Sequence, residues 1–123
     1  MHPIFAPSTL SRVVVLFIAL CCAATASAMS LRELRTLEKT EKRQGIHYVN
    51  YYLVGVMEGI LESEAQAVRR GAAPAICLNG RKLEPRMAKS LFDTELKRNS
   101  EVYEADMPVQ LVMFNALSTV YPC

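Results

Sequence analysis

The stretch IHYVNYYLVGVMEGILESEAQAVRRG, residues 46–71, decides the fold class because it carries the strongest hydrophobic periodicity in the front half of the chain. Its apolar residues recur at intervals of three and four, which is the spacing of one face of an α-helix. Two arginines and a glycine close the stretch, as is typical of a helix C-terminus. The predicted apolar face contains Ile46, Val49, Leu53, Val56, Met57, Ile60, Leu61 and Val68.

A second helix is predicted ahead of this stretch. SLRE, residues 30–33, is a capping box, in which the Ser30 hydroxyl and the Glu33 carboxylate can each satisfy a free backbone amide. Two cations followed by Gly45 mark the predicted end of this helix. We expect the helix to lie on the outside of the fold, because its apolar stripe is narrow. The stripe consists of Leu31, Leu34 and Leu37.

A third helix is predicted in the second half of the chain. It begins near Pro85, a residue favoured in the first helical turn, and ends before Asn99 and Ser100. Residues 71–84, which precede it, have the composition of a loop, with a proline, an Asn-Gly pair and a cysteine. The apolar side of this helix comprises Met87, Ala88, Leu91, Phe92 and Leu96.

The last predicted helix is capped by Asp106 and has Pro108 in its first turn. It is apolar over much of its circumference, so we expect it at the centre of the fold. One apolar stripe contains Val109, Val112, Met113, Ala116, Leu117 and Val120, and a second contains Leu111 and Phe114. Since strand signals are sparse, the sequence predicts an all-α domain, a small bundle of four to five helices.

Residues 1–28 have the composition of a signal peptide. Arg12 precedes the uncharged run VVVLFIALCCAA, residues 13–24, which suits the hydrophobic region of a signal peptide and is short for a membrane span. The following Ala-Ser-Ala, residues 26–28, supplies the small residues that a signal peptidase accepts. We therefore expect a cleaved leader, a periplasmic location and one domain over residues 29–123. An uncleaved membrane anchor is the alternative.

The predicted mature chain is nearly neutral. Of the 14 Lys and Arg residues only Arg12 leaves with the leader, and all 12 Asp and Glu residues stay, so the net charge is +1. This balance does not favour a nucleic-acid partner, which needs a concentrated basic surface. One cluster of cations near the predicted loop either meets an acidic partner surface or serves solubility. It consists of Arg69, Arg70, Arg81, Lys82, Arg86 and Lys89.

The predicted mature chain keeps two cysteines, Cys77 and Cys123, because Cys21 and Cys22 belong to the leader. An even number of cysteines in an exported chain predicts a disulfide, and two thiols allow one pairing; two free thiols are the alternative. Closing a loop of about 47 residues stabilises a fold by roughly 4 kcal/mol on the chain-entropy treatment. Pro122 ends the preceding helix, so the last residue can act as a tether.

Two features of the long helix predict contact surfaces. Gly55 and Gly59 lie one turn apart, and each costs about 1 kcal/mol relative to alanine in a helix interior. Such a pair lets another backbone approach closely, so we expect it to pack against a helix of the same molecule or of a second copy in a homodimer. Tyr48, Tyr51 and Tyr52 crowd the start of the helix, either as interface anchors or as half-buried residues at the edge of the core.

Few residues could carry catalysis. His47 is the only histidine of the predicted mature chain, so any Ser-His or Cys-His scheme would depend on it. Glu58 and Glu62 stand one turn apart and could form an acid-base pair, although a solvated helix face explains them more simply. The sequence lacks metal-binding His-His or Cys-x-x-Cys spacings and a glycine-rich phosphate loop. We therefore expect no enzyme activity, no metal and no cofactor.

Several features between Tyr48 and Cys123 are shared with one family. They are Cys77 ahead of a helix, the helix over residues 87–96, Pro108 at the opening of the last helix, the ending NALSTVYPC and, upstream, YYLVGVMEGI with its two glycines. In these features the chain resembles the Rap/Tai-type immunity proteins, small exported helical proteins that neutralise peptidoglycan-cleaving amidase effectors of type VI secretion. The resemblance implies an all-helical domain, a disulfide, and inhibition by occupying the active cleft of an enzyme.

The resemblance makes a binding protein the leading hypothesis, with a secreted peptidoglycan amidase as the partner. We expect the contact in the bridged loop at Asn79, Arg81 and Lys82, with Tyr103 and Glu104 in the next loop as alternates. Blocking a cleft requires shape and a few anchors rather than a catalytic group. The alternative is a periplasmic stress or chaperone-like module without a dedicated toxin partner, which would hold unfolded proteins through exposed apolar faces.

Overall fold

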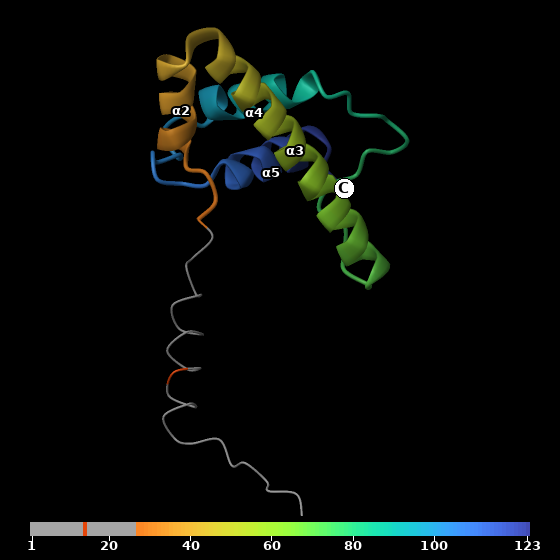
Figure 1. The fold of residues 1–123 in the computed structure, drawn as a ribbon. Coiled ribbons are helices and arrows are strands. Elements are labelled where there is room, and N and C mark those ends of the chain that lie inside the picture. Colours follow the sequence, from red (N-terminus) through yellow and green to blue (C-terminus); the bar gives the residue numbers. More distant parts are fainter. Residues whose placement is uncertain (1–13, 15–26) are drawn as a thin grey trace, which may run out of the picture.

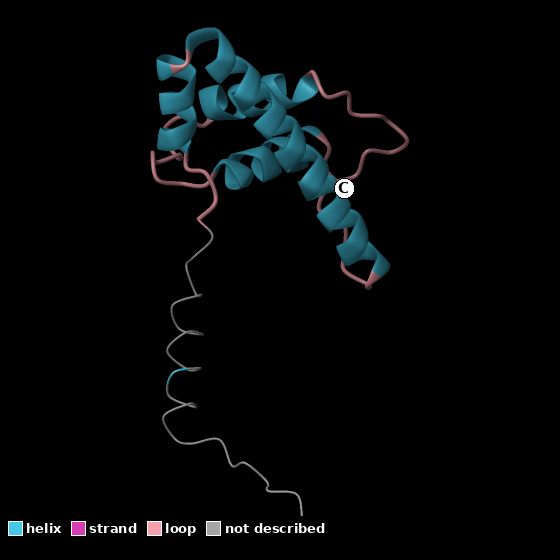
Figure 2. Cartoon of the chain, viewed as in Figure 1, coloured by secondary structure: helices cyan, strands magenta, loops and turns pink. Residues whose placement is uncertain are grey.

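The computed structural model describes residue 14 and residues 27–123, and in that part it contains four helices and no strand (Figure 1, Figure 2). The all-α fold predicted from the sequence is therefore confirmed. The predicted leader lies outside the described residues, apart from residues 14, 27 and 28. Within the described range no helix combines the length and the apolar character needed to cross a bilayer. The helices are α2 (Leu31–Thr40), α3 (Lys42–Arg69), α4 (Met87–Arg98) and α5 (Val109–Val120).

The long helix α3 is the scaffold of the bundle, since it contacts each of the other three helices (Figure 1). Its buried residues are Gly45, Val49, Leu53 and Met57, which follow the predicted helical spacing. Two members of the predicted apolar face, Ile46 and Val68, are instead exposed. The core is therefore built on the middle of α3, and the two ends of the helix extend beyond it.

Helix α5 supplies the largest share of the core and packs against both α3 and α4. Five of the six residues of its predicted main stripe are buried, while Val120 and Leu111 are exposed. The fully enclosed aromatic of the core is Phe92, on α4. The buried residues of α5 are Val109, Val112, Met113, Ala116 and Leu117.

The start of the domain is fixed by the predicted capping box and by the segment that leads into α5. The Ser30 amide donates to Glu33 Oε2 at 2.7 Å, and the Glu33 amide donates to Ser30 Oγ at 3.3 Å. The Leu31 amide donates to the Met107 carbonyl at 3.0 Å, and the Val109 amide donates to the Met29 carbonyl at 3.0 Å. These contacts begin at Met29, the residue that cleavage after Ala28 would place first.

The predicted helix end at Gly45 is wrong. Helix α2 stops at Thr40, α3 begins at Lys42, and Gly45 is a buried residue in the first turns of α3. The chain turns the corner at Lys42, whose φ of 43° lies in the left-handed region. A glycine behind two cations is typical of a helix end, but here it allows α3 to lie close against α2.

The predicted N-cap of the last helix is also wrong. Pro108 occupies the N-cap position of α5 and provides no side-chain cap. Asp106 instead pairs with Arg32 on α2 through atoms 2.9 Å apart, and both side chains are exposed. Pro108 is held in place by a short backbone bridge to Ser30, so the start of α5 is positioned by the neighbouring chain segment.

Candidate functional site

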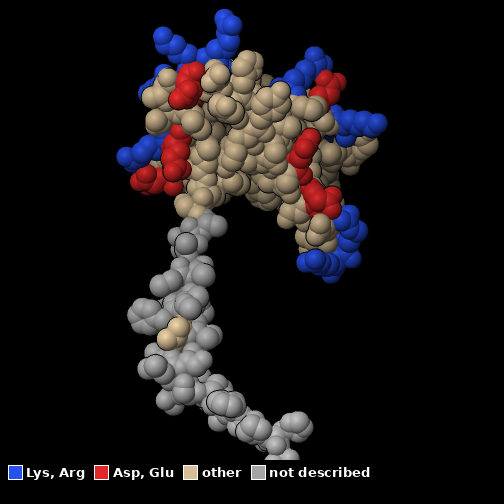
Figure 3. Space-filling view, in the orientation of Figure 1, with Lys and Arg blue, Asp and Glu red and all other residues tan. Residues whose placement is uncertain are grey.

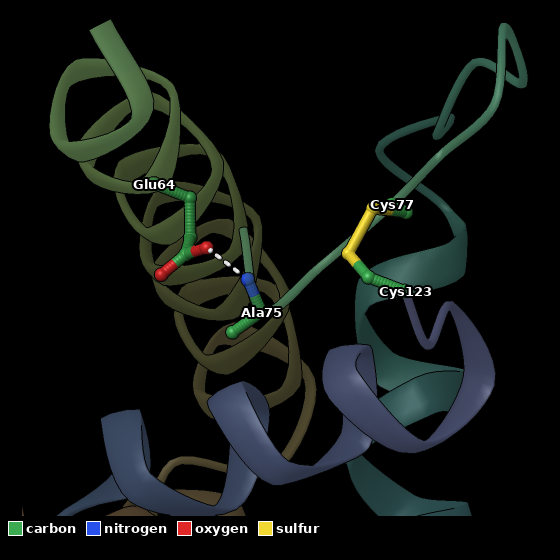
Figure 4. Close-up of a disulfide and its surroundings, with 4 residues drawn as sticks. All are labelled: Glu64, Ala75, Cys77 and Cys123. Atoms are coloured by element: carbon green, nitrogen blue, oxygen red, sulfur yellow. Dashed lines mark hydrogen bonds between the residues drawn. A yellow bond between two sulfur atoms is a disulfide. The ribbon is translucent and has the colours of Figure 1, made fainter. Parts of the chain in front are cut away.

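The loop between α3 and α4, residues 70–86, is the largest irregular segment of the described chain and is fixed at its base (Figure 1, Figure 4). The predicted disulfide is confirmed: Cys77 is bonded to Cys123, and the Cys77 amide donates to the Tyr121 carbonyl at 2.9 Å. A second anchor lies two residues earlier, where the Ala75 amide donates to Glu64 Oε2 on α3 at 3.1 Å (Figure 4). We call residues 78–84 beyond these anchors the bridged loop.

The bridged loop begins with a tight turn. The Arg81 amide donates to the Leu78 carbonyl at 3.0 Å, and the two central residues, Asn79 and Gly80, have φ values of 51° and 79°. Asparagine and glycine are the residues that adopt this left-handed conformation most easily, which explains the Asn-Gly pair. Asn79 and Gly80 are exposed, and the loop projects away from the helices in Figure 1.

Two of the three predicted contact residues of the bridged loop have structural roles. Asn79 forms the turn, and Arg81 holds it, because its guanidinium lies 4.7 Å from the centroid of the Tyr121 ring and its Nε donates to the Leu78 carbonyl at 2.9 Å. Lys82 is exposed at the next position. Of the predicted set, Lys82 therefore presents its charge to solvent most directly.

The alternate contact site splits in two. Tyr103 is a core residue only 8% exposed, whereas Glu104 is exposed. The Tyr103 hydroxyl donates to Glu95 Oε1 at 2.6 Å and accepts from Asn115 Nδ2 at 2.9 Å. Burial raises the pKa of Tyr103 above its ordinary value of 10.0, and the hydrogen bond to the Glu95 carboxylate adds to the rise. The prediction of Tyr103 as a partner contact is therefore wrong.

The two predicted contact loops lie at opposite ends of α5. Residues 103–107 sit beside the start of α2, whereas the bridged loop leaves from the disulfide beyond the other end of α5 (Figure 1). A helix of 12 residues is about 18 Å long, so the two loops do not form one site. The sequence could not show this separation, because both loops flank the same two helices.

The expected intramolecular packing of Gly55 and Gly59 is wrong. A Cβ atom added to either glycine would meet no heavy atom of the described chain within 4 Å. The two glycines instead line an open groove of about 460 Å³ on the surface of α3. The other residues that line it are Tyr51, Tyr52, Val56, Ile60, Ser63 and Gln110.

The tyrosines beside this groove face solvent rather than the core. Tyr48 is 60% and Tyr51 is 77% exposed, while Tyr52 is partly buried and its hydroxyl accepts from Gln110 Nε2 at 2.9 Å. The other amide atom, Gln110 Oε1, is buried and has no hydrogen-bond partner among the described residues. These positions favour the interpretation of Tyr48 and Tyr51 as interface anchors over the interpretation as core-edge residues.

Most of the predicted basic cluster is paired within the molecule. Lys89 lies 2.7 Å from Asp93 and 3.2 Å from Glu38, and so links α4 to α2. Burial lowers the pKa of Lys89, but the hydrogen bonds to these two carboxylates outweigh it and leave the pKa raised above its ordinary 10.5. Arg69 pairs with Glu62, and Arg86 pairs with Glu84. On the face shown in Figure 3 charged side chains gather toward the edges.

The residues considered for catalysis do not converge on one another. His47 lines a second depression, of about 380 Å³, between α3 and the start of α4, together with Asn50, Tyr51 and Pro85. Glu62 accepts hydrogen bonds from Gln66 and Arg69, which lower its pKa below the ordinary 4.5 and keep it ionised. In the part of the chain that the structure describes, no group of three His, Cys, Asp or Glu side chains is placed to hold a metal ion.

Comparison of the chain with models of protein families, with curated proteins and with solved structures found no match.

Proposed function

We propose that this protein is an exported periplasmic immunity-type protein that binds a cell-wall-degrading amidase effector and blocks its active cleft with the bridged loop. The proposal rests on one structural observation, the projecting loop whose base is fixed by the disulfide between Cys77 and Cys123. The resemblance to the Rap/Tai-type immunity proteins suggests the class of partner. The disulfide favours an oxidising compartment, in agreement with the expected leader.

A fixed loop is suited to occlusion because its shape exists before binding. The disulfide, the Ala75 amide on Glu64 and the Arg81 guanidinium on Tyr121 hold the loop from three sides. A loop that is already ordered loses less conformational entropy on binding than a flexible one. Inhibition of this kind requires complementary shape and a few polar contacts, and it requires no catalytic group on the inhibitor.

The test is an inhibition assay with a purified peptidoglycan amidase effector encoded beside this protein. We expect stoichiometric inhibition of muropeptide cleavage and a complex of the two proteins in gel filtration. The variant Lys82→Glu should weaken inhibition, whereas Lys97→Glu, an exposed lysine at the far end of α4, should not. Full inhibition by the Lys82→Glu variant would remove the bridged loop from the contact, and absence of any complex would contradict the proposal.

The chaperone-like alternative is favoured by a different observation, the exposure of several large apolar side chains. Ile46, Val102 and Leu111 are 49%, 61% and 40% exposed, and they lie on separate elements. Scattered exposed apolar residues can hold unfolded chains weakly and without selectivity. This alternative predicts suppression of aggregation of unrelated reduced proteins, with no stoichiometric complex with the amidase.

A further inference from the structure

We propose that two copies of this protein associate through the exposed face of α3, crossing antiparallel about a two-fold axis at Gly55. The inference is independent of the proposed inhibitor function, because it rests on surfaces other than the bridged loop. The occupant of the groove on α3 is then the α3 helix of a second copy. We call the exposed face of α3 that includes Gly55 and Gly59 the glycine face.

The glycine face has room for a second helix. No heavy atom of the described chain lies within 4 Å of a Cβ added to Gly55 or Gly59. Each glycine costs the helix about 1 kcal/mol relative to alanine, and no contact in the described molecule offsets that cost. Small residues one turn apart allow two helix backbones to approach closely, so a helix is the occupant that would use this space.

The spacing of large and small residues about Gly55 is symmetric. Tyr51 precedes Gly55 by four residues and Gly59 follows it by four. In an antiparallel pair centred on Gly55, the Tyr51 side chain of each copy therefore lies over Gly59 of the other. Tyr51 is 77% exposed and Gly59 is open, so each copy offers both a projecting ring and a hollow to receive it.

The polar groups of the glycine face are also complementary about the same centre. Tyr52 and Glu58 lie three residues before and after Gly55, and Tyr48 and Glu62 lie seven before and after. Each pair sets a phenol donor opposite a carboxylate acceptor. These residues fall on one side of the helix, because separations of three, four and seven are close to whole helical turns. Tyr48, Glu58 and Glu62 are exposed.

The ends of the face carry opposite charges at equal distances from the centre. Glu41 lies 14 residues before Gly55 and Arg69 lies 14 after it, and both are exposed. A two-fold axis therefore places each Glu41 beside Arg69 of the other copy, giving two symmetric ion pairs. A surface that matches itself in shape, hydrogen bonding and charge is the requirement for an isologous dimer. This complementarity favours a second copy over an unrelated partner.

The expected association is reversible. One helix face buries less than the roughly 800 Å² per partner that is typical of a stable protein interface. We therefore expect sedimentation velocity of the purified protein to show monomers at low concentration and dimers at high concentration. A protein that stays monomeric at the highest concentration reached would overturn the proposal.

A charge exchange tests the register. Glu41→Arg and Arg69→Glu each replace two attractive contacts of the dimer by two repulsive ones, so each variant alone should dimerise about tenfold more weakly. A mixture of the two should recover dimers, because both contacts are then attractive in the heterodimer. The variants Glu101→Arg and Arg98→Glu change exposed charges away from α3 and serve as controls. A mixture with no preference for the heterodimer would contradict this register.

Cysteine cross-linking tests the position of the axis. A residue on a two-fold axis meets its own copy, so Gly55→Cys should form a disulfide-linked dimer on mild oxidation. Thr94→Cys, an exposed position on α4, should not cross-link at the same protein concentration. Equal cross-linking at both positions would show random collision and would overturn the proposed axis. Since Gly55→Cys adds a side chain at the closest contact, the charge exchange provides the independent measurement.

Discussion

Gly45 lies directly against the main-chain carbonyl oxygen of Leu37, at the corner where α3 folds back along α2. The backbone continues through this corner, since the Gly45 amide donates to the Glu41 carbonyl at 3.2 Å and the Glu41 amide donates to the Leu37 carbonyl at 3.2 Å. A Cβ at position 45 would overlap the Leu37 carbonyl and would come within 2.9 Å of the Glu41 side chain. The close approach of α2 and α3 therefore depends on glycine at this position.

Replacing Gly45 by alanine should destabilise the protein, by about 1–3 kcal/mol, because main-chain atoms must move to admit the new methyl group. The matched variant Gly59→Ala should stabilise the monomer by about 1 kcal/mol, since its methyl group meets open space within a helix. Urea denaturation at low protein concentration measures both. Equal effects at the two positions would show that the corner is not tightly packed.

Removing the disulfide should lower the free energy of unfolding by roughly 4 kcal/mol, if the chain-entropy treatment holds for a link between residues separated by 46 positions. The variant is Cys77→Ser combined with Cys123→Ser. Amide exchange should become faster at residues 75 and 77, where the loop is anchored to α3 and to the C-terminal segment. Unchanged protection of these two amides would show that the hydrogen bonds alone hold the loop.

The parts of the fold that follow from local sequence were predictable. The capping box at Ser30, the helical period of α3 and the thiol pair each depend on residues close in sequence or on a simple count. The errors arose where a distant segment decides the outcome. Gly45 follows the pattern of a helix end, but its role is set by Leu37 of the preceding helix, and Lys42, which turns the corner, has no sequence signature.

The candidate site was less predictable than the fold for the same physical reason. Tyr103 lies in a connecting segment, which suggests exposure, yet its hydroxyl is enclosed by Glu95 and Asn115 from the two flanking helices. The only hint in the sequence is that tyrosine and glutamate lie eight residues apart across a helix end. Gly55 and Gly59 were recognised as a contact surface, but only the structure shows that the surface is left open.

Arg81 and Lys82 should separate in their effects, although they are adjacent and carry the same charge. Arg81→Ala removes the contact with the Tyr121 ring and the hydrogen bond to the Leu78 carbonyl, so it should increase exchange of the Arg81 and Cys77 amides. Lys82→Ala should leave the loop ordered and mainly slow association with an acidic partner, an effect that weakens as salt is added. Hydrogen exchange and stopped-flow binding distinguish the two variants.

Acid should weaken the start of α2 through Glu33. The hydrogen bond from the Ser30 amide, followed by the one from the Ser30 hydroxyl, lowers the pKa of Glu33 below its ordinary 4.5. The carboxylate therefore contributes stability at pH values above 4.5, and the contribution is lost as the pH falls through the folded-state pKa. Glu33→Gln keeps a capping side chain without a titrating group, so the stability of this variant should fall less steeply below pH 4.5.

Alkaline pH should destabilise the core through Tyr103. The pKa of this phenol is raised above 10.0 in the folded protein by burial and by Glu95, so the unfolded chain releases its proton at lower pH. The contribution of Tyr103 to stability is therefore complete below about pH 10 and is lost as the pH rises through the folded-state pKa. Urea denaturation across this range should show a declining free energy of unfolding.

Tyr103→Phe isolates this contribution. The variant should be less stable at neutral pH by about 1–3 kcal/mol, because Glu95 Oε1 loses the 2.6 Å hydrogen bond from the phenol and keeps only the one from Asn99 Nδ2. Its free energy of unfolding should then decline less above pH 10 than that of the unsubstituted protein, so the two curves converge. Parallel curves would assign the alkaline loss to another group, and Tyr121→Phe, at a second buried tyrosine, provides the comparison.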